Sequence, residues 1–363
     1  MVTRTVRLLI LTAIFACTGV FGGFAAAYAQ EPANTPPVFQ QFALEAPSQN
    51  VAIDGSNRVW YTLPSVDKLA MVTPEGVVTH YPVDGDATPN NSQPYDLAVQ
   101  GNNVWFTMLA ANQIGVLDMT NGAVQRYTIP TADSQPTGIS LGSGFVWFVE
   151  RAGDKLGRFD PATQTFTEYY NWTPDARNPV DMRDADLEDV AWSGDGVWIT
   201  GPRFKNSVAL YRVNENRFIP SAAGVGAAPM QVVVDSEGSA WVTFSGLGKI
   251  GQSAINTLGV WNFKTLPAGQ GGPVGLFVRN HEGRRELWYT RPGDNRFGYV
   301  LVGFSGAQLG AWETSTPAGG SAPWGIAVDS ASRAWFSSSA GANVVVWNSP
   351  FFTNFIYMPS VRR

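Results

Sequence analysis

A short phrase built around a tryptophan occurs seven times along the chain, and it limits the possible folds more than any other feature. In each copy the tryptophan follows a small or aliphatic residue and precedes residues that favour β-strands. Successive tryptophans stand 42 to 51 residues apart, a period typical of propeller blades. The copies read RVWYT at Trp60, NVWFT at Trp105, FVWFV at Trp147, GVWIT at Trp198, SAWVT at Trp241, ELWYT at Trp288 and RAWFS at Trp335.

Each copy lies inside a unit that predicts four short antiparallel strands. An apolar run precedes a tight turn, such as QGNN at 100–103, and the tryptophan strand follows this turn. A third strand and a fourth strand that ends near a proline, such as VQRYTIP at 124–130, complete the unit. One such sheet cannot bury its own face, but sheets packed around an axis can. We therefore predict an all-β fold, a seven-bladed β-propeller of four-stranded antiparallel blades, with the tryptophans packed between neighbouring blades.

Two segments compete for the outermost strand of the last blade. Residues 354–359, NFIYMP, resemble the fourth strand of the other units. Residues 38–44, VFQQFAL, resemble an outermost strand as well. The N-terminal segment could add a strand beside the C-terminal one or could replace it, and the sequence leaves both arrangements open.

Residues 1–29 have the three parts of an export signal. Arg4 and Arg7 give a positive start, an apolar stretch follows, and Ala27-Tyr28-Ala29 forms a cleavage site. We expect a signal peptide that is cleaved after Ala29, and a protein that is secreted or periplasmic. A retained membrane anchor and a lipid attached to Cys17, the only cysteine, are the alternatives.

The composition fits a compact β protein and disfavours a nucleic-acid partner. The formal net charge is −5, 15% of the residues are charged, and no run of Lys or Arg forms a basic patch. The 38 Gly and 24 Pro residues suit a chain with many turns. After a disordered lead-in over residues 30–37 we expect one domain over 38–363. We expect it to be a monomer that binds no nucleic acid and has no membrane span once the signal is removed.

The third unit carries the phrases that relate the chain to a known family. It reads PTGI at 136–139, VWFVE at 146–150 and KLGRF at 155–159. These phrases, which recur in looser form over residues 46–359, resemble the streptogramin lyase (virginiamycin B lyase) family of β-propellers. The resemblance implies an enzyme that opens a cyclic depsipeptide antibiotic by elimination. It further implies a histidine base, acidic residues and Mg²⁺ at the central mouth.

The histidines of the chain depart from the pattern of that family. The chain has two, His80 and His281. His80 lies in VVTHYPV, an expected outermost strand. His281 lies in the hairpin before Trp288, at the end of the blade opposite the mouth. Neither is placed to act as the base that the resemblance implies, so the lyase activity does not follow from the resemblance.

A ligand site is expected where the chain enters each first strand and leaves each second strand. These segments meet around the mouth of the central channel, where a concave site with a few polar groups suits a ligand. Glu150 and Arg151 are adjacent there, and a carboxylate beside an arginine is expected to stay ionised, either to orient a ligand or as a structural ion pair. The candidate ligand-binding residues are Asn50, Tyr95, Asp96, Glu150, Arg151, Arg203, Gln231, Arg291 and Trp324.

The fourth unit has an acidic stretch, DMRDADLED at 181–189, in place of the usual proline. Oxygen ligands suit Mg²⁺ and Ca²⁺, so Asp186, Glu188 and Asp189 are candidate ligands of such a cation. Arg177 and Arg183 could instead neutralise a solvated acidic loop.

The favoured function is that of an exported binding protein that lacks the catalytic histidines of the family. Its mouth would accept a small molecule, a peptide or a glycan. The alternative is a divergent metal-dependent lyase or a lactone hydrolase that acts at the mouth with carboxylates. Convergence of the acidic residues at the axis would favour the enzyme.

Overall fold

The computed structural model describes residues 38–85, 91–171, 174–177, 179–203, 207–254, 258–317 and 321–348. All of them belong to one unit, Asn34–Arg363. Outside the described residues lie the predicted signal peptide over 1–29, Cys17, the lead-in over 30–37 and the candidate outer strand over 354–359.

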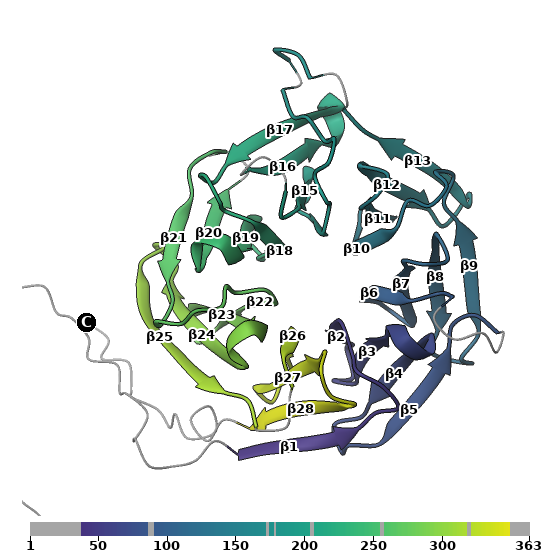
Figure 1. Ribbon diagram of the computed structural model, residues 1–363, viewed down its shortest axis with the longest axis vertical. Helices are drawn as coiled ribbons and strands as arrows, with labels where there is room; N and C mark the ends of the chain where they lie inside the picture. Colours follow the sequence, from purple (N-terminus) through teal and green to yellow (C-terminus); the bar gives the residue numbers. More distant parts are fainter. Residues whose placement is uncertain are drawn as a thin grey trace, which may run out of the picture. The chain divides into compact units, whose positions relative to one another are not determined.

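The described strands form seven four-stranded antiparallel sheets in a ring, so the predicted seven-bladed β-propeller is confirmed (Figure 1). Blade one contains β2 (Val51–Ile53), β3 (Val59–Leu63), β4 (Lys68–Val72) and β5 (Val78–Pro82). Blade two contains β6 (Pro94–Gln100), β7 (Asn103–Met108), β8 (Gln113–Asp118) and β9 (Val124–Thr128). Blade three contains β10 (Pro136–Gly142), β11 (Phe145–Glu150), β12 (Lys155–Asp160) and β13 (Thr165–Tyr169). Blade four contains β14 (Asp189–Trp192), β15 (Gly196–Thr200), β16 (Ser207–Arg212) and β17 (Arg217–Ala222). Blade five contains β18 (Pro229–Val234), β19 (Ser239–Phe244), β20 (Lys249–Ala254) and β21 (Asn262–Thr265). Blade six contains β22 (Leu276–His281), β23 (Arg284–Arg291), β24 (Arg296–Gly303) and β25 (Gln308–Ser315). Blade seven contains β26 (Pro323–Val328), β27 (Arg333–Ser338), β28 (Asn343–Asn348) and β1 (Val38–Ala43).

The N-terminal strand closes the ring. β1 pairs antiparallel with β28, from Val38 opposite Asn348 to Ala43 opposite Asn343. The strand order of this sheet is β1-β28-β27-β26, so the N-terminal segment holds the outermost position of the last blade. Strands from the two ends of the propeller sequence thus share one sheet, and the first and last blades cannot separate without breaking it.

The recurring tryptophans fill the spaces between neighbouring blades, as predicted. Six of them are at most 1% exposed, and Trp105 is 6% exposed. Trp147 of blade three packs in one apolar cluster with Val197 of blade four. Trp335 of blade seven packs in the same way with Val59 of blade one. Each blade therefore buries its face against its neighbour, which is why the ring must close.

The threonine that follows most of these tryptophans ties each blade to the next. The hydroxyl of Thr243, for example, donates to the backbone oxygen of Val274, at the start of the next blade (2.8 Å). Blade three has Val149 at this position, and there Thr137 donates to the backbone oxygen of Leu187 instead (2.9 Å). The same kind of contact joins Thr62 to Tyr95, Thr107 to Thr137, Thr200 to Met230, Thr290 to Trp324 and Ser337 to Gln49.

Helical structure in the described residues is limited to single 3-10 turns between strands. These are η1 (Pro64–Val66), η2 (Val213–Glu215), η3 (Ser245–Leu247) and η4 (Pro292–Asp294). Across this described part of the chain, no helix has the length and hydropathy of a membrane span.

Candidate functional site

The first strand of each blade lies nearest the axis, as Figure 1 shows for β6, β10, β18, β22 and β26. A central cavity of about 300 Å³, including its opening to solvent, lies between these strands. Its lining residues are Asn50, Tyr95, Asp96, Glu188, Asp189, Met230, Gln231, Val274 and Trp324. The structure thus brings together five of the nine candidate ligand-binding residues, namely Asn50, Tyr95, Asp96, Gln231 and Trp324.

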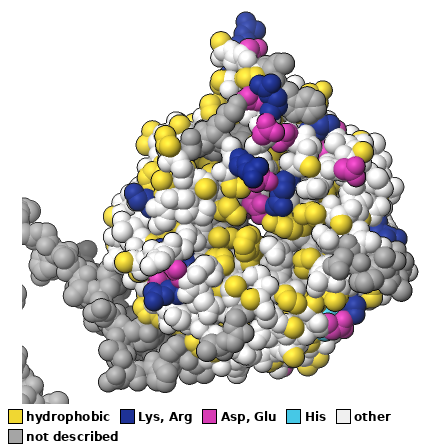
Figure 2. Space-filling model, viewed as in Figure 1, with side chains coloured by type: hydrophobic (Ala, Val, Ile, Leu, Met, Phe, Trp, Pro, Cys, Tyr) yellow, Lys and Arg dark blue, Asp and Glu magenta, His cyan; other side chains and the backbone are white. Residues whose placement is uncertain are grey.

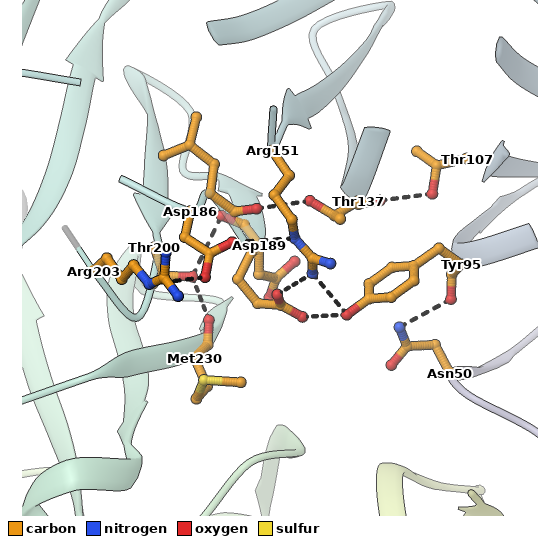
Figure 3. Close-up of polar contacts among 12 residues, drawn as sticks. Asn50, Tyr95, Thr107, Thr137, Arg151, Asp186, Asp189, Thr200, Arg203 and Met230 are labelled. Carbon is orange, nitrogen blue, oxygen red and sulfur yellow. Dashed lines mark hydrogen bonds and ion pairs between the residues drawn. The ribbon is translucent and has the colours of Figure 1, made fainter. Parts of the chain in front are cut away.

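A network of polar side chains from three blades surrounds Arg151, just after β11 (Figure 3). Its Nη2 donates to Glu188 and, at 3.0 Å, to the hydroxyl of Tyr95. Tyr95 in turn donates to Glu188 Oε1 (2.6 Å). Asp186 stands between two arginines, 3.7 Å from Arg151 Nε and 3.7 Å from Arg203 Nε. Figure 2 shows positive and negative side chains side by side on this face, next to hydrophobic side chains around the central opening.

Two carboxylates of the cavity, Asp96 and Asp189, lie among the inner strands. Asp96 accepts a hydrogen bond from the backbone of Ile139 (3.0 Å), and Asp189 accepts one from the backbone of Val232 (2.9 Å). Burial raises the pKa of Asp96 to about 7. Burial, together with the charge of Asp96, raises the pKa of Asp189 well above its usual range. The pair therefore retains a proton at neutral pH, because two charged carboxylates would repel each other there.

The amide side chains of the cavity also join adjacent blades. Asn50 Nδ2 donates to the backbone oxygen of Tyr95 (3.0 Å). Gln231 Oε1 accepts from the backbone nitrogen of Leu276 (2.5 Å). The polar lining thus holds the inner strands together in addition to facing the cavity.

Glu150 is next to Arg151 in the sequence, but the two side chains form no ion pair with each other. Successive residues of a strand point to opposite faces, and Glu150 is fully buried. Burial, and then the charge of Glu168, raise the pKa of Glu150 to about 7, while the charge of Lys155 and the nearby hydroxyls of Ser134 and Thr131 act to lower it. The structural ion pair considered for Glu150 and Arg151 is therefore not formed, since Arg151 binds Glu188 instead.

Arg291, another candidate ligand-binding residue, does not line the cavity. Its buried Nη1 donates to both oxygens of Glu313 (3.0 and 3.2 Å) and to the backbone oxygen of Pro267 (3.0 Å). Tyr289 donates to the same carboxylate (3.1 Å). Arg291 therefore belongs to a buried ion pair of blade six. Arg203, in contrast, has a side chain that is 78% exposed beside the mouth.

The three candidate metal ligands do not converge on one point. Among the described residues, no group of three or more His, Cys, Asp or Glu side chains is arranged to hold a metal ion. Glu188 is bound by Arg151 and Tyr95, Asp186 lies near two arginines, and Asp189 accepts from the backbone. Arginines thus act as the counter-ions of Asp186 and Glu188, and this donor set does not fit the Mg²⁺ ion that the family resemblance implies.

Both histidines of the sequence lie away from the mouth, as predicted. His80 is in β5, an outermost strand, and its Nδ1 is 3.3 Å from Glu45 Oε1. His281 ends β22, at the hairpin that leads into β23, and its Nδ1 is 3.0 Å from Glu286 Oε1. Neither imidazole can reach a ligand in the central cavity.

Sequence reasoning missed two lining residues, Met230 and Val274, and the hydrogen bond between Tyr95 and Glu188. Met230 and Val274 each follow a proline at the start of an inner segment, as Tyr95 and Trp324 do. This repeated proline was a signal that could have identified all four. The contact between Tyr95 and Glu188 joins residues of different blades, so no local pattern encodes it.

Known proteins similar to this chain are propellers. The Virginiamycin B lyase family matches residues 38–193. Virginiamycin B lyase from Staphylococcus aureus has a TM-score of 0.72 at 20% identity, over 86% of this chain and 99% of the lyase. A catalytically inactive histidine-to-alanine variant of that lyase with quinupristin gives a TM-score of 0.72 at 19% identity, with the same coverage. A streptogramin B lyase gives 0.73 at 22% identity, over 86% of this chain and 97% of that lyase.

A sensor domain is a more distant structural relative. It is the extracellular domain of a putative hybrid two-component system from B. thetaiotaomicron, with a TM-score of 0.64 at 13% identity, over 86% of this chain and 40% of that one. No curated protein matches the sequence. The resemblance inferred from the repeated phrases is confirmed: this chain is a seven-bladed propeller similar to the virginiamycin B lyases, by sequence over residues 38–193 and by fold over 86% of its length.

Proposed function

We propose that this chain is an exported binding protein that holds a small peptide-like ligand at the mouth of its propeller, without histidine-dependent ring opening. The observation that carries the proposal is the network of Tyr95, Arg151 and Glu188 at the mouth, in a chain whose two histidines both lie elsewhere. Elimination needs a base that can take a proton, and this network offers none that is free to do so.

The network suits recognition better than proton transfer. The oxygens of Glu188 are already bound by the Arg151 guanidinium and the Tyr95 hydroxyl. Arg203 and Asp186, in contrast, keep exposed surface, with side chains 78% and 34% exposed. One cation and one anion are therefore accessible to a ligand at the mouth.

A peptide with free termini matches these groups. Its carboxylate would pair with Arg203 and its ammonium group with Asp186, each by a charge-assisted hydrogen bond. The apolar lining residues Met230, Val274 and Trp324 would contact its side chains.

The proposed export rests on residues 1–29, which carry the pattern of a signal peptide. The extracellular propeller domain of the sensor from B. thetaiotaomicron supports the same location.

Calorimetric titration with tripeptides that have free termini tests the proposed binding. We expect the tripeptides to bind, and we expect Arg203→Ala, or blocking of both peptide termini, to weaken binding at least about tenfold. Arg126→Ala, which removes an exposed arginine from the outer strand β9, is the matched control and should leave binding unchanged. Equal binding of free and blocked peptides, or no binding of either, would overturn the proposal.

A second function, hydrolysis by cavity carboxylates, is favoured by Asp96 and Asp189. Burial raises the pKa of both carboxyl groups, and a pair of carboxyl groups that shares a proton suits acid–base catalysis. A lactone hydrolase of this kind would hydrolyse a panel of lactones, and Asp96→Asn would abolish its turnover. No turnover by the wild type would exclude it.

Thermal unfolding with and without Mg²⁺ or Ca²⁺ separates the binding protein from a metal-dependent enzyme. Because arginines already act as counter-ions of the mouth carboxylates, we expect no change in Tm. A cation that binds the folded chain alone would add about 2.7 kcal/mol of stability at 100-fold excess over its Kd, and such a rise would favour the enzyme.

A further inference from the structure

The tryptophan of blade two lines a surface hollow that is separate from the central cavity. Trp105 is 6% exposed, and the hollow beside it has about 620 Å³, including its opening to solvent. The lining comes from β7, β8, the β8–β9 turn and β9, with Pro161 from blade three. Asn103 begins β7 at the hairpin end of the blade, so the hollow opens at the end opposite the mouth.

One position of the repeat differs between blade two and blades one and seven. The residue two before the tryptophan is an arginine in blade one, where the Arg58 guanidinium lies 5.9 Å from the Trp60 ring centroid. Blade seven has the same arrangement, with the Arg333 guanidinium 5.3 Å from the Trp335 ring centroid. Blade two has Asn103 at this position, which carries no guanidinium group. Within the described part of the chain, no Lys or Arg lies over that indole ring.

The floor of the hollow is aromatic. Tyr127 stacks on Trp105, with ring centroids 6.3 Å apart and an interplanar angle of 24°. The indole N–H of Trp105 has no hydrogen-bond partner among the described residues. In four other blades the equivalent N–H donates to a carboxylate, namely in Trp60, Trp241, Trp288 and Trp335. Two aromatic rings, Trp105 and Tyr127, are therefore among the lining residues of the hollow, and the Trp105 N–H is a donor without a partner among the described residues.

Amide side chains and one carboxylate form the rim of the hollow. Tyr127 donates to Gln125 Oε1 (2.8 Å), and Asn121 donates to Asp118 Oδ2 (3.1 Å). The Gln125 amino group and the Asn103 amide find no partner in the described part of the protein. No Lys or Arg is among the lining residues, so an anionic ligand would meet no cation there.

We propose that the hollow over Trp105 binds a neutral carbohydrate. A sugar ring presents C–H groups on its face, which pack on aromatic rings, and hydroxyls at its edge, which donate and accept hydrogen bonds. Trp105 and Tyr127 supply the aromatic surface. Asn103 and Gln125 supply amide groups, and Asp118 supplies an acceptor. This site is separate from the peptide site of the mouth, because it lies at the other end of the blade.

Titration with neutral trisaccharides of glucose, galactose, mannose and N-acetylglucosamine tests the proposal, with trigalacturonate and acetyl-trialanine amide as other ligand classes. We expect at least one neutral trisaccharide to bind. Asn103→Arg should weaken its binding at least about tenfold, because the new side chain would cover Trp105 as Arg58 covers Trp60. Asn214→Arg adds the same charge at an exposed turn and should leave binding unchanged.

A second variant guards against a change in fold. Gln125 is exposed, and Gln125→Ala should weaken binding about two- to tenfold, the effect of one hydrogen bond, with an unchanged Tm. Binding of none of the four trisaccharides would overturn the proposal. So would tighter binding of the uronic acid or the peptide, or sugar binding that both Asn103→Arg and Gln125→Ala leave intact.

Discussion

The residues that pack between the blades follow the sequence repeat, whereas the polar residues at the mouth of the channel depart from it. Between the blades, Trp241 and Thr243 stand at positions where most other blades carry the same residue type. At the mouth, Tyr95, Arg151 and Glu188 come from three blades and are not repeated at the matching positions. The repeated residues thus hold the ring together, and we propose that the residues that depart from the repeat form the ligand site.

Two adjacent residues mark the boundary between these regions. Glu150 is fully buried between strands, whereas Arg151 binds Glu188 at the mouth. One step along the chain therefore separates a residue that we expect to affect stability from one that we propose affects recognition. The predictions below test whether the two roles separate this sharply.

The largest effect is expected for a tryptophan between the blades. Trp241 is fully buried and its Nε1 donates to Asp235 (2.9 Å). Trp241→Ala should lower the free energy of unfolding by about 3–5 kcal/mol in urea titration, because it leaves a large cavity. Val225→Ala, at a side chain that is 89% exposed, should change it by less than about 0.5 kcal/mol. Similar losses of stability in the two variants would contradict the claim that the tryptophans between the blades hold the ring together.

The next effect concerns pH and the buried Glu150. Its pKa is raised from 4.5 to about 7, so its carboxyl group holds a proton more tightly in the folded chain than in the unfolded chain. Its contribution to stability should be complete below about pH 4.5 and be lost as pH rises through 7, by at most about 3 kcal/mol.

Unfolding measured from pH 5 to pH 8 checks this contribution. Glu150→Gln should remove it and should be more stable than the wild type at pH 8. Glu215→Gln, at an exposed carboxylate, should leave the pH profile unchanged. A Glu150→Gln protein that is less stable than the wild type at pH 8 would show that the ionised carboxylate has a partner.

A smaller loss is expected for a threonine that joins two blades. Thr243→Val removes the donor to the backbone oxygen of Val274 and should lower the free energy of unfolding by about 1–3 kcal/mol. Thr165→Val, at an exposed position of β13, is the control and should have little effect. An effect no larger than that of the control would mean that the inter-blade hydrogen bonds do not stabilise the ring.

The smallest effect on stability is expected at the mouth. Arg203→Ala removes an exposed side chain whose ion pair spans 3.7 Å, and the free energy of unfolding should change by less than about 0.5 kcal/mol. The same variant should lose most of its peptide binding. A large loss of stability together with unchanged binding would reverse the assignment of the two regions.

Most of the fold could be predicted because the repeated tryptophan and its turns are local signals. The strand that closes the ring could not be predicted, because residues 38–44 and 354–359 both have the pattern of an outermost strand. The pairing of β1 with β28 shows that the first of these segments takes that position. Predicting the site failed where a partner is distant in sequence. Arg291 binds Glu313, and the acidic stretch before β14 meets Arg151 of the preceding blade.

The most direct test of the central claim is to incubate the protein with a cyclic depsipeptide antibiotic of the kind that the lyases open, in the presence of Mg²⁺. Liquid chromatography with mass spectrometry then follows the ring, since elimination gives a linear isomer of unchanged mass and hydrolysis adds one water. We predict that the antibiotic remains cyclic, because no histidine reaches the mouth. A linear isomer that forms with the wild type would contradict this account.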